Sequence, residues 1–406
     1  MEERLSYYFG GELRKLREKA GFSLKQLSKI SSVDKGYLSR IENQLRSPSD
    51  SLLAHLYQSL NYNLIIEDFV LSDLEKKLNY LYRDLVYDNP IEEKATDDLF
   101  EYHFDSYIYS PLIIKFYLIY YVWLVTKKHD IPLILKIEDR LNELNQKIKF
   151  YPQELQIFLD YQGVRYKNEN NFKKAITFFE RAKDLGKYPY SFGMVCYHLG
   201  IAYDRSSRIV EAIDIQKTAL ACFIEEGNHK RQLYTKTHIA NTYSQYGNYE
   251  QADLWYKQLL NNCNNNEIYE RIKRNLIWNN IKRKVYSEAL ELLLNTQESN
   301  FTSLSYYLLI LCFYKLHDYK SAMSWIHKGK EESIHDLITY SKIDTIEKLI
   351  IYDDNPNLII QHLEETYRQL NPCLDIEGKQ FYLQLLIDIY EKQNRLDKAF
   401  YYQKQL

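Results

Sequence analysis

Small and aromatic residues recur at matching positions between residues 155 and 265, and this repetition constrains the fold more than any other feature. Gly163, Gly200 and Ala240 stand 37 and then 40 residues apart. In each copy a tyrosine follows after three residues and an alanine after twelve; these residues are Tyr166, Tyr203, Tyr243, Ala175, Ala212 and Ala252. Small residues at fixed spacing allow two helices to touch, and aromatic residues fill the space between neighbouring pairs. The pattern predicts stacked helix pairs.

Weaker copies follow, and the overall composition agrees with an all-α chain. Ala289, Ala322 and Ala399 mark three further second helices, and residues 334–370 are expected to hold another degenerate pair. Residues 71–150 have helix periodicity without the landmarks. Only twelve glycines and eight prolines occur in 406 residues. The copies resemble tetratricopeptide repeats, which implies a right-handed superhelix whose concave face is the expected ligand site.

A second pattern lies near the start of the chain, between Gly21 and Asn43. Ser23 with Gln26 three residues later is a capping box, and the apolar residues Leu24, Leu27 and Ile30 follow at helical spacing. The turn 31–33 comes next. This segment predicts a short helix with its apolar side turned inward.

A second short helix is expected after that turn. Asp34 is a suitable N-cap, and Leu38 and Ile41 are spaced to face inward. Two short helices joined by a tight turn form a helix-turn-helix, whose second helix enters the major groove of DNA.

Residues Tyr8 to Leu64 resemble the Cro/repressor type of helix-turn-helix domain, which implies five helices. The matching positions are Leu13, Leu16, Arg17, Gly21, Ser23, Gln26, Val33, Tyr37, Leu38, Ser39, Arg40, Ile41, Glu42 and Pro48. In that family the position of Arg17 commonly pairs with that of Glu42. The resemblance therefore implies a structural ion pair between these two residues.

The same resemblance implies which residues contact DNA. The base-facing positions are those of Lys35, Gly36, Ser39 and Arg40, and the phosphate-contacting positions are those of Lys25, Gln26, Asn43 and Arg46. An arginine at position 40 suits a bidentate contact with guanine. Glycine at position 36 departs from the long polar residue that family members often carry. The alternative for Lys25, Lys35 and Arg46 is an ordinary solvated face.

Charge, cysteines and hydropathy restrict the class of protein further. Residues 1–60 contain ten Lys or Arg and seven Asp or Glu, whereas the rest contains 43 and 48. Only the front end is suited to phosphates. The five cysteines form no CxxC pair, and no apolar leader precedes the acidic start Met1-Glu2-Glu3. We therefore expect a protein of the reducing cytoplasm. The apolar run Ile108 to Val125 is interrupted by Pro111 and Lys115, which favours a buried helical segment over a membrane span.

In overall organisation the chain resembles the RNPP group of peptide-pheromone-responsive transcription regulators. The resemblance implies three parts: residues 1–68 as the DNA-binding domain, 69–150 as a helical linker or divergent repeats, and 151–406 as a peptide-sensing and dimerisation domain. It implies a homodimer that binds an operator in double-stranded DNA and a short linear peptide, as in quorum sensing. Family members hold the peptide backbone with asparagine side chains and its carboxylate with basic residues.

The repeat register predicts which residues face the peptide. In the third repeat these are Tyr234, Thr237, Asn241 and Gln245. The next first helix offers Arg271, Arg274, Asn275, Trp278 and Asn279, and Tyr307 is expected to add an aromatic wall. For Asn241, Arg271 and Arg274 the alternative is a solvated helix surface.

No motif of catalysis, metal binding or cofactor binding is found in the sequence. We therefore expect no enzyme, no metal and no cofactor. Two alternatives to the peptide-controlled regulator stay open: an adaptor whose repeats bind a protein partner such as a response regulator, and a mobile-element repressor whose repeats only oligomerise.

Overall fold

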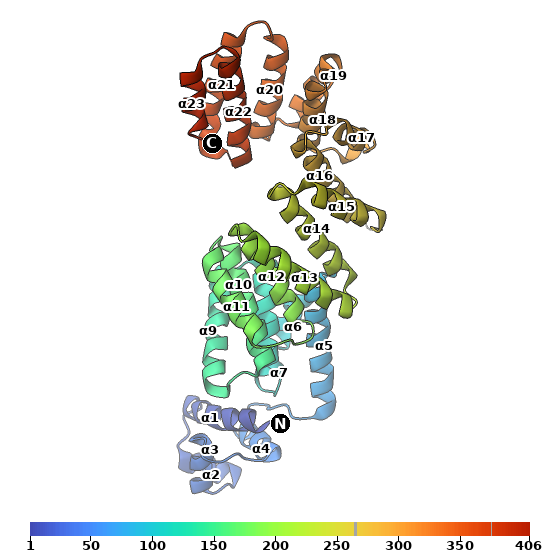
Figure 1. Cartoon of the computed structure of the whole chain (residues 1–406). Coiled ribbons are helices and arrows are strands. Elements are labelled where there is room, and N and C mark those ends of the chain that lie inside the picture. The colour runs from blue at the N-terminus through green and yellow to red at the C-terminus, as the bar shows by residue number, and fades with distance from the viewer. Residues whose placement is uncertain (264–265, 375) are drawn as a thin grey trace. The chain divides into compact units, whose positions relative to one another are not determined.

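The computed structural model describes residues 1–263, 266–374 and 376–406, and they form helices joined by turns and loops, with no strand in these ranges. Two compact units are present, Met1–Thr242 and Tyr243–Leu406. The prediction of an all-α chain is confirmed (Figure 1). None of the helices within the described ranges is both long enough and apolar enough to cross a bilayer.

Four helices make up the N-terminal part of the first unit: α1 (Glu3–Lys19), α2 (Leu24–Ser31), α3 (Lys35–Glu42) and α4 (Asp50–Gln58). A fifth helix was expected before Leu64. Instead the chain turns at Asn61, which has a φ of 62°, and Ile65 donates its N–H to the carbonyl of Tyr109 at 2.8 Å. The next helix starts only at Asp68, so the expectation of five helices within Tyr8–Leu64 is wrong by one helix.

Five α-helices and one π-helical turn follow: α5 (Asp68–Tyr87), α6 (Glu93–Tyr102), α7 (Phe104–Ile108), α8 (Ile113–Trp123), the turn η1 (Leu124–Lys128) and α9 (Ile131–Ile148). The apolar run expected to be buried is α8 with its flanks, and Phe116, Tyr121 and Trp123 are fully buried in it. The predicted boundaries at residues 68 and 150 fall at the first residue of α5 and in the loop after α9.

Polar contacts fix the N-terminal helices to α9 and to the next helix, α10 (Pro152–Asn168). Arg4 forms two 3.0 Å hydrogen bonds with the carboxylate of Glu154, and its guanidinium lies 3.6 Å from the ring centre of Tyr151. Arg140 donates to the hydroxyl of Tyr8 at 2.9 Å. Because these contacts join α1 to α9 and α10, the N-terminal helices belong to the first compact unit and do not form a separate one.

Helix pairs with the predicted landmarks occupy the rest of the chain. In the first unit they are α10 with α11 (Phe172–Asp184) and α12 (Phe192–Arg205) with α13 (Ile209–Glu225), followed by most of α14 (His229–Gln245). Gly163 lies against Phe179, where a Cβ atom would come within 2.4 Å of the ring, and Gly200 lies against Gln216 in the same way at 2.5 Å. The small residues therefore permit the close approach that the repeat pattern predicted.

Within its described residues, the second unit contains the end of α14 and nine further α-helices, which include the degenerate pair expected at 334–370. The helices are α15 (Tyr249–Asn261), α16 (Asn266–Lys282), α17 (Tyr286–Leu294), α18 (Ser303–Lys315), α19 (Tyr319–Glu332), α20 (Leu337–Ile351), α21 (Pro356–Leu370), α22 (Ile376–Lys392) and α23 (Leu396–Gln403), with short 3₁₀ turns at Glu298–Asn300 and Asn371–Cys373. Ala289, Ala322 and Ala399 are buried as their landmark role requires.

Candidate DNA interface and peptide site

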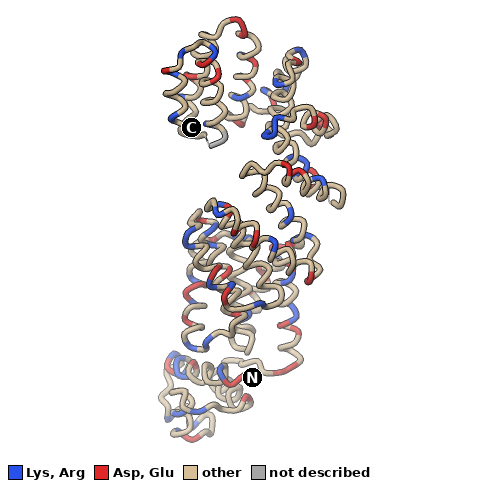
Figure 2. Tube along the Cα trace, in the orientation of Figure 1, with Lys and Arg blue, Asp and Glu red and all other residues tan. Residues whose placement is uncertain are grey.

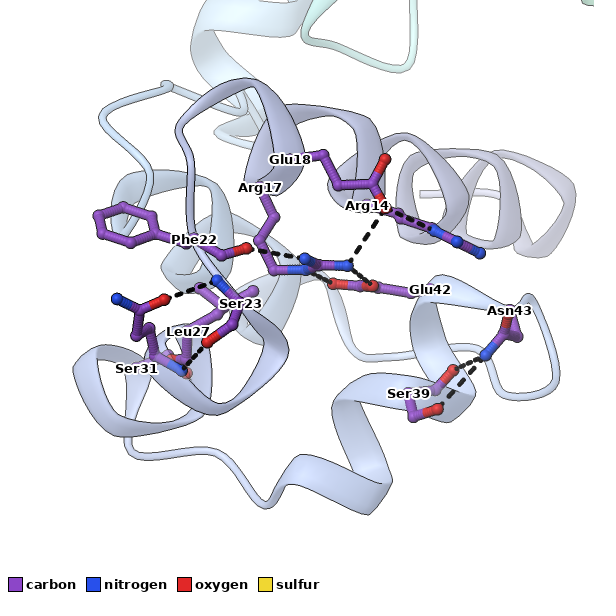
Figure 3. Close-up of polar contacts among 11 residues, drawn as sticks. Arg14, Arg17, Glu18, Phe22, Ser23, Leu27, Ser31, Ser39, Glu42 and Asn43 are labelled. Carbon is purple, nitrogen blue, oxygen red and sulfur yellow. Dashed lines mark hydrogen bonds and ion pairs between the residues drawn. The ribbon is translucent and has the colours of Figure 1, made fainter.

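The two helices of the helix-turn-helix begin where the sequence predicts, because their caps form, and Figure 3 shows the first of them at Ser23. Ser23 accepts a hydrogen bond from the N–H of Gln26 at 3.2 Å, and Gln26 Oε1 accepts one from the N–H of Ser23 at 2.8 Å. The carboxylate of Asp34 accepts from the N–H of Tyr37 at 2.8 Å. Ser32, in the left-handed region with a φ of 57°, makes the turn between the helices. These caps fix the direction in which α3 leaves the turn.

An ion pair with little solvent exposure ties α1 to α3. Arg17 Nε and one terminal nitrogen each lie 2.7 Å from an oxygen of Glu42, and the other terminal nitrogen donates to the carbonyl of Phe22 at 2.8 Å (Figure 3). Hydrogen bonding to Glu42 raises the pKa of Arg17. The predicted pair is thus confirmed, and its fork geometry orients α3 relative to α1.

Most of the apolar residues expected to face inward do so. Leu27, Leu38 and Ile41 are fully buried. Ile30 is the exception, with 48% of its surface exposed. Ser31 takes the inward position instead and donates its hydroxyl to the carbonyl of Leu27 at 2.7 Å, because residues four apart share a face of so short a helix.

The predicted DNA-contacting side chains lie on the outer side of this scaffold. Exposed positions are those of Lys25, Gln26, Lys35, Gly36, Arg40, Asn43 and Arg46, whereas Ser39 is half-buried. Asn43 donates to the carbonyl of Ser39 at 2.7 Å and lies 3.3 Å from its hydroxyl, so these two side chains are held together. Arg40 bends back on its own helix, with Nε 3.4 Å from the carbonyl of Gly36. Lys and Arg are interspersed with Asp and Glu over both units rather than gathered on one (Figure 2). Any DNA affinity therefore depends on a few well-placed cations.

The predicted peptide contacts of α14 are in different environments. Tyr234 donates its hydroxyl to the carboxylate of Asp88 at 3.1 Å. Thr237 is buried and donates to the carbonyl of Leu233 at 2.7 Å, so its side chain does not face a ligand as expected. Asn241 is half-buried in the first unit and Gln245 is exposed in the second.

On α16 the predicted residues separate into an accessible stripe and a buried one. Arg271 and Arg274 are exposed, and Asn275 and Trp278 are half-buried, at the spacing of one helix face. Asn279 is fully buried and donates its amide to the carbonyl of Tyr249 at 3.1 Å, where it supports the start of α15. The expectation that Asn279 contacts the peptide is not supported, because the helix turns this residue toward its neighbour.

A cavity of about 410 Å³ brings several of these residues together within the second unit. Its lining includes Arg274, Asn275 and Trp278 together with Phe301, Leu304, Leu308, Lys273 and Lys342. Lys273 is only 6% exposed, and its amine donates to the carbonyl of Asn295 at 3.1 Å. Burial lowers the pKa of Lys273. The charge of Glu270, which also lines the cavity, opposes this shift. The cations Lys273, Arg274 and Lys342 outnumber this one acid in the lining, which favours binding of an anionic group.

Sequence reasoning missed Lys273 and Lys342 and misplaced Tyr307. Tyr307 is buried, with its ring 6.1 Å from that of Phe381, and Lys342 lies over it at 5.4 Å. Lys273 stands in the basic stretch that supplied Arg271 and Arg274, so a rotation of one residue, about 100°, separates it from the predicted Arg274. Lys342 had no local signal, because α20 reaches the cavity only through tertiary packing.

Together, a Cro/C1-type helix-turn-helix and a tetratricopeptide-like array are the architecture of RNPP-type regulators. A helix-turn-helix family model matches residues 13–64. The transcriptional activator NprA of Geobacillus stearothermophilus is 23% identical over 270 residues, which are 64% of this chain and 64% of NprA. The match thus spans slightly less than two thirds of that relative.

Two solved structures have the same fold. The apo form of the quorum sensor NprR from B. thuringiensis has a TM-score of 0.65 at 18% identity, and covers 83% of this chain and 98% of its own. NprR in complex with its cognate peptide NprX has a TM-score of 0.50 at 19% identity, and covers 82% and 98%. At these identities the likeness concerns the fold.

Proposed function

We propose that this chain is a sequence-specific DNA-binding transcription regulator whose activity is controlled by a short linear peptide. The observation that carries the proposal is the presence in one chain of a capped α3 with an exposed Lys35 and Arg40, and of a cation-lined cavity on first helices of the repeat array. The likeness to an activator and to a quorum sensor supports it.

On the DNA side, α3 enters the major groove. Arg40 contacts a base edge and Lys35 lies beside it, while Lys25, Gln26, Asn43 and Arg46 contact phosphates. A single small domain with few cations binds weakly, so we propose a homodimer that places two copies of α3 one helical turn apart, about 34–36 Å. Cys196, Cys222, Cys312 and Cys373 form no disulfide, which supports a location in the reducing cytoplasm.

On the peptide side, the cavity of the second unit takes one end of the ligand. Lys273 and Arg274 attract a carboxylate, the amide of Asn275 matches a peptide group, and Trp278 with Phe301 contacts an apolar side chain. Gln245 and Arg271 of the same unit are proposed as further contacts of the peptide, and Asn241 of the first unit is proposed separately as a contact of a peptide backbone.

The test is a thermal-shift screen of the full chain against synthetic peptides of five to ten residues taken from small open reading frames beside the gene. A ligand at about a hundred times its Kd stabilises the native state by roughly 2.7 kcal/mol, which raises the melting temperature measurably. Arg274→Ala and Asn241→Ala are expected to reduce the shift. Lys320→Ala is the matched control, since this exposed cation of α19 does not line the cavity.

Three results speak against the proposal. A shift that is unchanged in both variants contradicts the assigned site. Stabilisation by a folded protein partner and by no peptide favours an adaptor instead, and oligomerisation without any ligand favours a plain repressor.

A further inference from the structure

The first turns of α14 hold the end of α5, a helix that lies more than 140 residues earlier in the chain. Helix α5 ends at Tyr87, and Asp88 follows in the left-handed conformation with a φ of 55°. Lys230, Arg231 and Tyr234 of α14 all contact this end. Such a concentration of contacts on four residues is unusual for a helix terminus, whose last carbonyls usually meet water or a local cap.

One group of these contacts is made to backbone carbonyls at the end of α5. Arg231 Nε donates to the carbonyl of Val86 at 2.7 Å, and a second guanidinium nitrogen lies 3.4 Å from the carbonyl of Leu85. Lys230 Nζ donates to the carbonyl of Asp88. These carbonyls carry the negative end of the helix dipole, so two cations are well matched to them. Contacts to main-chain carbonyls do not depend on the identity of the side chains.

A specific apolar contact comes from Val86, which is fully buried. It inserts into a cluster formed by α12 and α13, whose other buried members are Phe192, Met194, Cys196, Tyr197, Ala219 and Phe223. The Arg231 guanidinium lies 5.5 Å from the ring centre of Tyr197, at the edge of this cluster. The cluster selects a medium-sized apolar side chain at this position.

A specific charged contact comes from the Asp88 carboxylate, two residues after Val86. It lies 3.0 Å from Lys230 Nζ and 3.5 Å from Lys127 Nζ, and it accepts the Tyr234 hydroxyl at 3.1 Å. Burial opposes ionisation, but the hydrogen bond from Lys230 and the charges of Lys230 and Arg231 hold the pKa of Asp88 below its ordinary value. Asp88 is therefore bound as a carboxylate.

We propose that this surface of α12 to α14 is a binding site for a chain segment with an apolar residue two positions before a carboxylate, and that Leu85–Asp88 is its resident occupant. Backbone clamps, one apolar pocket and one carboxylate clamp are the means by which proteins bind linear segments. Lys230 and Asp88 keep about a third of their side-chain surface exposed, so a competing segment has access to the charged part of the site.

An external peptide of the same chemistry displaces the end of α5. Because α5 begins at Asp68, directly after the helix-turn-helix domain, its release removes one anchor of the segment that supports that domain. The inference extends the proposed function and rests on it only in taking the external ligand to be a peptide. The tethered occupant has a high effective concentration, so the external ligand must bind the vacated site with correspondingly higher affinity.

The test uses the full chain and a fluorescein-labelled synthetic peptide with the sequence of residues 79–89, measured by fluorescence anisotropy. Asp88→Asn weakens the resident segment, and we expect it to bind the probe at least ten-fold more tightly than the wild type. Addition of Arg231→Ala to Asp88→Asn is expected to abolish that gain. Asp73→Asn, the same substitution on an exposed part of α5, is the control and is expected to match the wild type.

Hydrogen exchange of the wild type provides a second readout that requires no variant. Excess probe is expected to accelerate exchange of the amides of residues 82–88. Equal probe binding by Asp88→Asn and Asp73→Asn, together with unchanged exchange at residues 82–88, overturns the inference. Since neither readout uses DNA or a natural peptide, failure here is distinct from failure of the proposed function.

Discussion

The ion pair between Arg17 and Glu42 allows a quantitative prediction of how much a substitution destabilises the N-terminal helices. Both side chains have at most a tenth of their surface exposed, and their two hydrogen bonds are 2.7 Å long. Glu42→Leu leaves the Arg17 guanidinium with the carbonyl of Phe22 at 2.8 Å and the more exposed carboxylate of Glu18 at 3.7 Å. Breaking a buried pair in this way costs about 3–5 kcal/mol. Local opening of α1 to α4 then becomes about 140 to 4,000 times more frequent, since 1.4 kcal/mol is a factor of ten.

Native-state hydrogen exchange is the suitable assay, because it reports local opening of α1 to α4 separately from the repeats. The amides of Leu38 and Ile41 are expected to lose protection by that factor in Glu42→Leu. Paired replacement by Arg17→Met and Glu42→Leu is expected to recover most of it, because apolar residues of similar volume replace buried ion pairs at little cost.

The exposed pair of Arg14 and Glu18 supplies the control. These side chains lie 2.9 Å apart on one face of α1 and are more than half exposed. Glu18→Gln is expected to leave exchange at Leu38 and Ile41 unchanged within error, since exposed pairs contribute little. If Glu42→Leu gives the same exchange as Glu18→Gln, the buried pair does not hold α3, and the reasoning is refuted.

Three further predictions follow from the site and the core. Arg40→Ala is expected to weaken binding to specific DNA by about 1–3 kcal/mol and binding to random DNA much less, whereas Lys35→Ala is expected to weaken both and to reduce the salt dependence of binding. Fluorescence anisotropy titrations with both DNAs measure these effects. Equal losses on both DNAs for Arg40→Ala would contradict its contact with a base. Burial raises the pKa of the Cys196 and Cys312 thiols to about 12, so at pH 8 only roughly one molecule in ten thousand is a thiolate at either position. Iodoacetamide labelling followed by mass spectrometry should therefore modify the exposed Cys373 and leave Cys196 and Cys312 unmodified. The lowered pKa of Asp88 contributes stability that is present above the ordinary pKa of aspartate and is lost as the pH falls below it. In denaturant unfolding between pH 5 and pH 3, the free energy of unfolding should therefore fall less steeply in Asp88→Asn than in the wild type. Parallel dependence of the two proteins on pH would count against the carboxylate contact.

Local signals in the sequence predicted the helix-turn-helix well. The capping box at Ser23 and the cap at Asp34 depend only on residues three positions apart, and both formed. The repeat landmarks were equally reliable, because a small residue such as Gly163 has meaning only where a second helix approaches. These features depend on residue type and on short spacing along the chain, and both can be read from a single sequence.

Features that depend on contacts between distant segments were not predictable in this way. Thr237 and Asn279 stand at plausible positions of their helices, yet the packing of neighbouring helices buries them. A rotation of one residue, about 100°, decides between a ligand-facing and a buried position, and the weak landmarks after residue 265 do not determine it. The contact of Asp88 with Lys230 joins segments 142 residues apart, and no local pattern indicates it.

The central claim is that a peptide bound by the repeats changes the grip of the helix-turn-helix on DNA. The most direct measurement is the Kd of the full chain for an operator recovered by selection from random DNA, at fixed salt, with and without a saturating peptide found in the thermal-shift screen. The account predicts that the peptide changes this Kd by about five-fold or more, as a coupling free energy of at least 1 kcal/mol requires, and that Arg274→Ala removes the change. An operator Kd that is identical with and without bound peptide would contradict it.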